Sequence, residues 1–136
     1  MITASPAHAD IMAAVHGAVF PDEPWDAASF ASLLAQPGMF GWLDERGGLL
    51  LLRVVADEAE IITIGAVTKR RGIGRALLQA GLEQARSLGV AKVHLEVAVT
   101  NPPARALYGA AGFKPTGRRR AYYSNGEDAL LMAMEI

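Results

Sequence analysis

The chain has 136 residues, of which 51% are apolar and 20% are charged. This is the length and composition of one globular domain, residues 1–136, that buries roughly 70% of the surface of its unfolded chain. The 14 acidic and 13 basic residues leave a formal charge of −1, so the overall charge favours neither nucleic acid nor an anionic membrane as a partner. Every apolar run is far shorter than the roughly 20 residues of a membrane-spanning helix.

Three absences narrow the chemistry and the compartment that we expect. Residues 1–6 have no basic residue ahead of an apolar run, which a secretory signal requires. With no cysteine, the sequence offers no disulfide framework, no thiolate metal site and no thiol nucleophile. His8 and His16 have no carboxylate pattern of a metal site between them. We therefore expect a cytoplasmic protein that binds no metal.

The first half of the chain predicts two helices and then three strands. Ser5-Pro6 is typical of a helix start and predicts a helix to about Phe20. Asp26 is placed to cap a second helix that runs through Leu34. Turn residues then separate three segments with strand composition. The predicted strands cover 39–43, 49–55 and 60 to about 67.

The second half predicts helix, strand, helix and two strands. Apolar positions recur at helical spacing from Ile73 to Leu88 and stop at Gly89. A strand over 92–99, a helix from Pro102 that ends before Gly112, and closing strands over 113–117 and 129–135 follow. Because strand 60–67, its helix and strand 92–99 form one crossover unit, we expect a mixed α/β fold: a mostly antiparallel sheet with one parallel pair and about four helices.

A glycine turn, Arg70-Arg71-Gly72-Ile73-Gly74-Arg75, lies where a strand turns into a helix. The first amides of that helix and the positive end of its dipole favour an anion there, and arginines add charge-assisted hydrogen bonds. A plain turn with solvated arginines explains the same residues. The dinucleotide fingerprint needs a third glycine where Leu77 stands, and the Gly-Lys-Ser/Thr of a P-loop is absent.

Three motifs together resemble the GNAT superfamily of N-acetyltransferases over nearly the whole chain. They are the glycine turn with the Ala-Leu-Leu that follows it, the strand triplet Leu95-Glu96-Val97, and the spaced set Asn101, Ala104, Leu107, Tyr108, Gly112 and Phe113. Together with the tail from Arg119 to Ala129, they are similar to the RimI type. That type acetylates the N-terminal alanine of a ribosomal protein.

The resemblance implies that acetyl-CoA is the co-substrate. It places the pyrophosphate on the amides of 71–75 and the pantetheine arm on the strand backbone of 64–66, with Asn101 also facing the cofactor. Lys69 departs from the usual Gln or Arg, and the loop before Gly72 is about two residues short, which leaves open which amides bind the pyrophosphate. The implied cofactor residues are Ile64, Ala66, Arg70, Arg71, Gly72, Ile73, Gly74, Arg75, Asn101 and Tyr108.

Acetyl transfer to an amine needs a proton acceptor for the amine and a proton for the departing thiolate. Glu96 is the candidate base, because a carboxylate on an otherwise apolar strand is partly desolvated. A structural glutamate paired with Arg119 or Arg120 is the alternative. Tyr108 is the candidate acid, since a phenol of pKa about 10 stays protonated above a thiol of about 8.5. Its alternative is packing beside Leu107.

Other polar and aromatic residues fall near the same site. His94 shares a strand face with Glu96 at about 7 Å and is a second candidate base, unless it is merely exposed or buried in the core. The resemblance places the acceptor groove near Trp25 on one side and Tyr122 and Tyr123 on the other. Ordinary packing is the alternative for all three.

The pKa of the acceptor amine favours one substrate class. An α-amine near 7.7–8.0 is easier to deprotonate than a lysine near 10.4, by roughly 3.4 kcal/mol. A single modest base therefore suits a protein N-terminus, such as that of a ribosomal protein, although a small-molecule amine of low pKa fits equally well. A domain that binds acyl-CoA without turnover is the alternative from another class, and Glu96 with Tyr108 argues against it.

Overall fold

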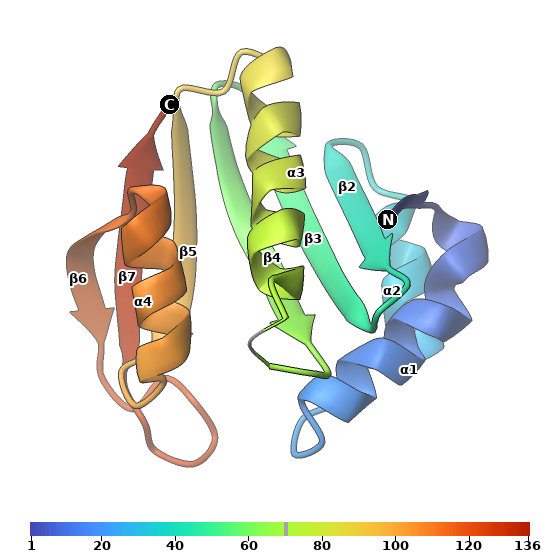
Figure 1. Ribbon diagram of the computed structural model, residues 1–136, viewed down its shortest axis with the longest axis horizontal. Coiled ribbons are helices and arrows are strands. Elements are labelled where there is room, and N and C mark those ends of the chain that lie inside the picture. The colour runs from blue at the N-terminus through green and yellow to red at the C-terminus, as the bar shows by residue number, and fades with distance from the viewer. Residues whose placement is uncertain (70) are drawn as a thin grey trace.

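Seven strands form one sheet in the order β1-β2-β3-β4-β5-β7-β6 (Figure 1). The computed structural model describes residues 1–69 and 71–136. Along the chain, the elements are β1 (Ile2–Ala4), a 3-10 turn (Pro6–His8), α1 (Ala9–Val19), α2 (Ala27–Leu34), β2 (Met39–Asp44), β3 (Gly48–Val55), β4 (Glu58–Ala66), α3 (Ile73–Ser87), β5 (Lys92–Ala98), α4 (Pro102–Ala111), β6 (Lys114–Arg119) and β7 (Ala129–Glu135). None of the described helices is both long and apolar enough to cross a bilayer.

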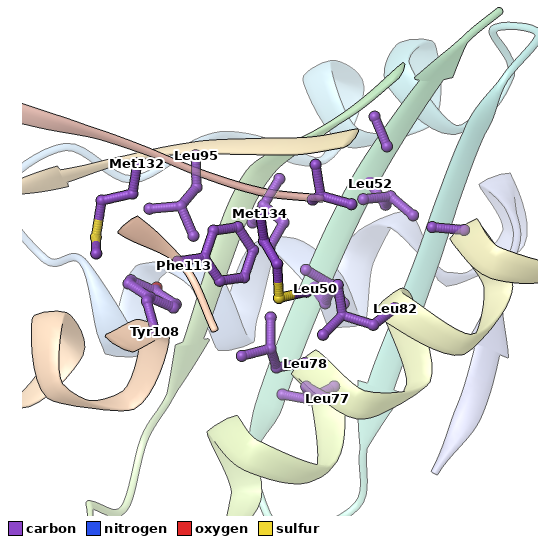
Figure 2. Packing of buried hydrophobic residues seen from close by; sticks show 14 of the residues in the cluster. Leu50, Leu52, Leu77, Leu78, Leu82, Leu95, Tyr108, Phe113, Met132 and Met134 are labelled. Atoms are coloured by element: carbon purple, nitrogen blue, oxygen red, sulfur yellow. The ribbon is translucent and has the colours of Figure 1, made fainter. Parts of the chain in front are cut away.

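Strand β3 lies at the centre of the packing and is buried on both faces. Its four consecutive leucines, Leu49 to Leu52, are at most 1% exposed and alternate between two cores. Leu49 and Leu51 pack with Met12 and Phe30 of α1 and α2. Leu50 and Leu52 belong to the larger core under α3, which Figure 2 shows together with Leu95, Phe113 and Met134. A continuous apolar run is what a strand covered on both faces requires.

The predicted order of elements is confirmed, with differences at segment ends; strand β6, for example, covers Lys114–Arg119 rather than 113–117. Strand β1 was not predicted: Ile2–Ala4 is only three residues long and forms because the edge of β2 is free to pair with it. The first helix does not run from Pro6 as one piece, since a 3-10 turn precedes α1. Strand β4 begins at Glu58 rather than at residue 60, because a tight turn with Ala56 at positive φ joins it to β3.

The only parallel pair among the described strands, β4 and β5, is hydrogen-bonded at one end alone. Its ladder covers Glu58 to Glu60 opposite Lys92 to His94. Just beyond, Leu51 pairs with Thr63 and Leu52 with Ile61, so one residue of β4 bulges out of the β3 ladder. From residue 63 to Ala66, β4 therefore has a strand neighbour on one side, and its other backbone edge is open. Figure 1 shows β4 and β5 diverging toward the starts of α3 and α4.

Candidate active site

Strands β4 and β5 are farthest apart near the starts of α3 and α4 (Figure 1), and we call this region the wide end of the gap between them. Most of the segments that the sequence indicated as functional lie there. The starts of α3 and α4 lie there with loops 20–26 and 120–128 (Figure 1). Side chains join these loops: the Ser124 hydroxyl donates a hydrogen bond to the Glu23 carboxylate, and the Thr100 hydroxyl donates to Glu127 at 2.6 Å. Segments far apart in sequence thus form one site.

The glycine turn has the backbone shape of an anion site. Gly72 caps α3 with a left-handed φ of 74° and without a capping side chain, a conformation that favours glycine. A side chain at Gly72 would meet no atom within 4 Å, so the space in front of the helix is open. The first helical bond joins the Ala76 amide to the Gly72 carbonyl, which leaves the amides before Ala76 without a helix acceptor.

Not every residue of the predicted cofactor set faces that open space. Ile73 is 1% exposed and packs in the core, so only its backbone can contact a ligand. Gly74 lies against α4, because a Cβ there would be 3.2 Å from Leu107. Arg71 and Arg75 are exposed. The prediction for Arg70 lies outside the described residues.

An ion pair between the buried carboxylate of Asp44 and the exposed side chain of Arg46, which the sequence did not predict, supports the glycine turn from the β2–β3 hairpin. Asp44 is 5% exposed and accepts two side-chain hydrogen bonds from Arg46, at 2.9 and 2.7 Å. These bonds lower the pKa of Asp44 to about 2. Arg46 also donates to the carbonyl of Arg71 at 3.4 Å. In the sequence, the polar residues of this hairpin predict a turn but not the ion pair.

Glu96 lies half-buried on β5 and has the partner named in the structural alternative. Its Oε1 is 3.4 Å from Nε of Arg119, and Arg119 lies over the ring of Tyr122 at 5.3 Å. The nearby Glu96 carboxylate is the main cause that raises the pKa of Tyr122. A hollow of about 240 Å³ opens beside them, lined by Glu60, His94, Leu95, Glu96, Thr116, Arg119, Leu131 and Met132. The structure thus brings Glu96 close to Tyr122, one of the residues predicted to border the acceptor groove.

The ring of Tyr108 is buried in the core under α3 and α4. The residue is 6% exposed and packs edge-on against Phe113 at 6.0 Å (Figure 2). Burial, and then the neighbouring Tyr123, raise its pKa well above the ordinary value. No described residue makes a hydrogen bond to the hydroxyl, and no buried side-chain oxygen in the described chain lacks a partner. The hydroxyl must therefore touch solvent, where it can donate to a ligand.

Tyr123 interacts electrostatically with both candidate catalytic residues. It is half-buried, and burial followed by the charge of Glu96 raises its pKa to about 12. It also affects the pKa of Tyr108. Tyr123 is thus near enough to Glu96 on one side and to Tyr108 on the other for the pKa values of the two tyrosines to be affected.

Two other predicted residues make contacts of their own. His94 is paired with Glu58 across the β4–β5 ladder, with Nε2 2.8 Å from Oε1, so its ring nitrogen already has a partner other than Glu96. Asn101 caps α4 by accepting the amide of Ala104 at 3.3 Å. That bond uses the side-chain oxygen of Asn101 and leaves its amide nitrogen for a ligand.

A second hollow, of about 570 Å³, lies at the opposite end of β5. It is lined by Asp57, Glu58, Ala91, Lys92, Glu135 and Ile136, and none of the predicted site residues borders it. The smaller hollow is therefore the one that borders the candidate base Glu96.

Comparison with known proteins identifies the family. The model of the Acetyltransferase (GNAT) family matches residues 9–113. The [ribosomal protein bS18]-alanine N-acetyltransferase of Escherichia coli is 36% identical over 121 residues, which cover 83% of this chain and 82% of that protein. The N-alpha-acetyltransferase RimI of Mycobacterium tuberculosis is 41% identical over 122 residues, covering 82% and 75%.

A solved structure confirms the predicted fold. The crystal structure of the ribosomal-protein-S18-alanine N-acetyltransferase from Escherichia coli matches with a TM-score of 0.86 and 30% identity, covering 99% of this chain and 93% of that one. The mixed sheet with its single parallel pair is therefore the GNAT fold that the motifs predicted. The chain belongs to the acetyltransferase (GNAT) family and is an N-acetyltransferase similar to the RimI type.

Proposed function

We propose that the chain transfers an acetyl group from acetyl-CoA to the α-amine of a protein N-terminus, with a ribosomal protein as the acceptor, in the cytoplasm. The observation that carries this proposal is the similarity, over about four-fifths of the chain, to two proteins named for acetylation of an α-amine. The chemistry of the site agrees, because a single carboxylate suits an amine that is already partly neutral at pH 7.

At the wide end of the gap, backbone groups without a partner in the protein are placed to bind acetyl-CoA. The unpaired amides at the start of α3 would hold the pyrophosphate, and the open backbone edge of β4 near Ile64 to Ala66 would pair with the pantetheine amides. Asn101 has an amide nitrogen left to donate. The bound co-substrate supplies an activated acyl group, and the protein aligns it with the amine.

Glu96 would accept the amine proton through a bridging water. Only one of its oxygens is close to Arg119, and that contact is a long 3.4 Å to an arginine that is itself exposed. The pair is therefore weak, and the second oxygen can accept a hydrogen bond from water in the adjoining hollow. The contact with Arg119 orients the Glu96 carboxylate toward Tyr122 and Tyr123, and it leaves the second oxygen available to accept the proton.

Tyr108 would donate to the sulfur as the thiolate leaves. Its raised pKa keeps the phenol protonated at every pH near neutrality. A phenol of higher pKa than a thiol donates a hydrogen bond readily and gives up the proton less readily. Its contribution is therefore to stabilise developing negative charge on sulfur.

A panel of acceptors tests the proposed function. We expect kcat/KM, measured by thiol release, to be much larger for an alanine-initiated peptide than for the same peptide with a blocked N-terminus and an internal lysine. The difference in neutral fraction alone is about 300-fold at pH 7. A higher kcat/KM for a small-molecule amine than for the peptide would overturn the assignment. Acetyl-CoA binding with no turnover on any amine would favour the non-catalytic alternative.

Gly74→Asp tests the site proposed for the pyrophosphate. We expect a loss of acetyl-CoA affinity of at least about ten-fold by calorimetry, because the carboxylate repels the phosphates at the helix start. Gly74→Ala is the matched control, since any side chain there also presses on Leu107, 3.2 Å away. If the two variants bind acetyl-CoA equally well, packing alone explains Gly74 and the pyrophosphate binds elsewhere.

A further inference from the structure

A buried histidine, His16, has no part in the chemistry described so far. It lies near the end of α1 and is 3% exposed. Its Nδ1 accepts a hydrogen bond from the backbone amide of Trp25 at 3.2 Å, and its ring stacks on the Trp25 indole with centroids 4.6 Å apart. Two independent contacts thus tie this side chain to one residue of loop 20–26.

The imidazole is also the centre of an aromatic cluster that joins both leading helices. The ring of Phe20 lies 4.8 Å from that of His16, and the ring of Phe30 on α2 lies 5.5 Å from it. Trp25 also contacts Phe30, at 5.7 Å. The described elements that pack on His16 therefore present aromatic rings to it from α2 and from loop 20–26.

The protonation state of His16 suits a hydrogen-bond acceptor. Burial lowers its pKa below the ordinary value of 6.5, so the ring is neutral at pH 7. A neutral imidazole can accept a hydrogen bond at only one of its two nitrogens. In His16 this nitrogen is Nδ1, because it accepts the hydrogen bond from the amide of Trp25.

Loop 20–26 borders the site from two directions. At its start, Phe20 and Val19 lie so close to Gly65 of β4 that a Cβ on that glycine would come within 2.5 Å of Val19. Further along, Glu23 accepts the hydrogen bond from Ser124, next to Tyr123. The loop therefore extends from the face of β4 at Gly65 to the loop that carries Tyr122 and Tyr123.

We propose that His16 is a positioning residue that holds Trp25 and loop 20–26 in the conformation that binds the acceptor. This inference rests on the proposed function, because it takes the acceptor to lie between Trp25 and Tyr123. His16 acts through its acceptor nitrogen and its stacked ring, and it does not touch the reacting atoms.

Two substitutions separate these contacts. His16→Phe keeps an aromatic ring and removes the nitrogen that accepts the hydrogen bond from Trp25. His16→Asn keeps an oxygen that can accept this hydrogen bond and removes the ring. We expect His16→Phe to raise KM for an alanine-initiated peptide about five- to ten-fold, with kcat and the KM for acetyl-CoA changed less than about two-fold. For His16→Asn, we expect a KM for the peptide between those of wild type and His16→Phe. Met12→Leu, a core substitution on the same helix, is the control and should leave the ratio of the two KM values unchanged.

Fluorescence gives a readout that does not depend on activity. The chain has two tryptophans, so Trp42→Phe leaves Trp25 as the single emitter. In that background we expect His16→Phe to raise acrylamide quenching of Trp25, because the released loop exposes the indole. Unchanged quenching, or equal changes in both KM values, would overturn the inference. A wild-type protein that acetylates no peptide would instead overturn the proposed function, and the quenching result would still decide the role of His16.

Discussion

Glu96→Gln is expected to lower kcat/KM for an alanine-initiated peptide by about 10²- to 10⁴-fold near neutral pH, the range typical of a lost general base. Acetyl-CoA affinity should stay unchanged, since Glu96 lies on the acceptor side of the gap with Arg119 and Tyr122. Activity should recover in part as the pH rises above about 8, because more of the acceptor amine is already neutral there.

Arg119→Gln is the matched control for Glu96. Both substitutions break the same ion pair, which on the surface contributes at most about 1 kcal/mol to the free energy of unfolding. If Glu96 is only a structural partner of Arg119, the two variants will have similar activities and similar thermal midpoints. Profiles of kcat/KM against pH that superimpose for wild type and Glu96→Gln would rule out the general-base role.

Tyr108→Phe is expected to lower kcat by about 10²- to 10⁴-fold while the Kd for acetyl-CoA changes little. The phenylalanine ring can occupy the same buried position against Phe113, so only the hydroxyl is lost. Because no described residue holds that hydroxyl by a hydrogen bond, its removal leaves no protein group unpaired. The free energy of unfolding should therefore remain close to that of wild type.

Tyr122→Phe provides the comparison for Tyr108. It removes the phenol of a residue that is 48% exposed and whose pKa is raised mainly by Glu96, and we expect a far smaller effect on kcat. Single-turnover kinetics at saturating acetyl-CoA would separate the chemical step from product release. Wild-type turnover in Tyr108→Phe would reduce that residue to a packing role.

Local signals explain why most of the fold could be predicted. The glycine-bounded helix α3 and the alternating strand β5 carry their own periodicity, and their buried faces agree with it. Asp26 caps α2 through the amide of Ser29, as its position predicted. The three residues of β1 carry no such pattern, because their pairing depends on the free edge of β2.

The shape of the site depends on contacts between residues far apart in the sequence, so it was harder to predict from local patterns than the fold. The motifs indicated Glu96 and Tyr108, but the one-ended pairing of β4 and β5 follows from a bulge that no local residue pattern reveals. The support that Asp44 and Arg46 give to Arg71 joins positions 25 or more residues apart. His16 was considered only as a metal ligand, because its partner Trp25 is brought to it by the turn between two helices.

The location of the acetyl group on a single peptide tests the central claim most directly. The peptide would begin with alanine and carry one internal lysine, and it would be incubated with the enzyme and acetyl-CoA and then sequenced by fragmentation mass spectrometry. The account predicts one acetyl group, on the α-amine, and its loss in Glu96→Gln at neutral pH. Acetylation of the lysine side chain, with the α-amine left free, would contradict it.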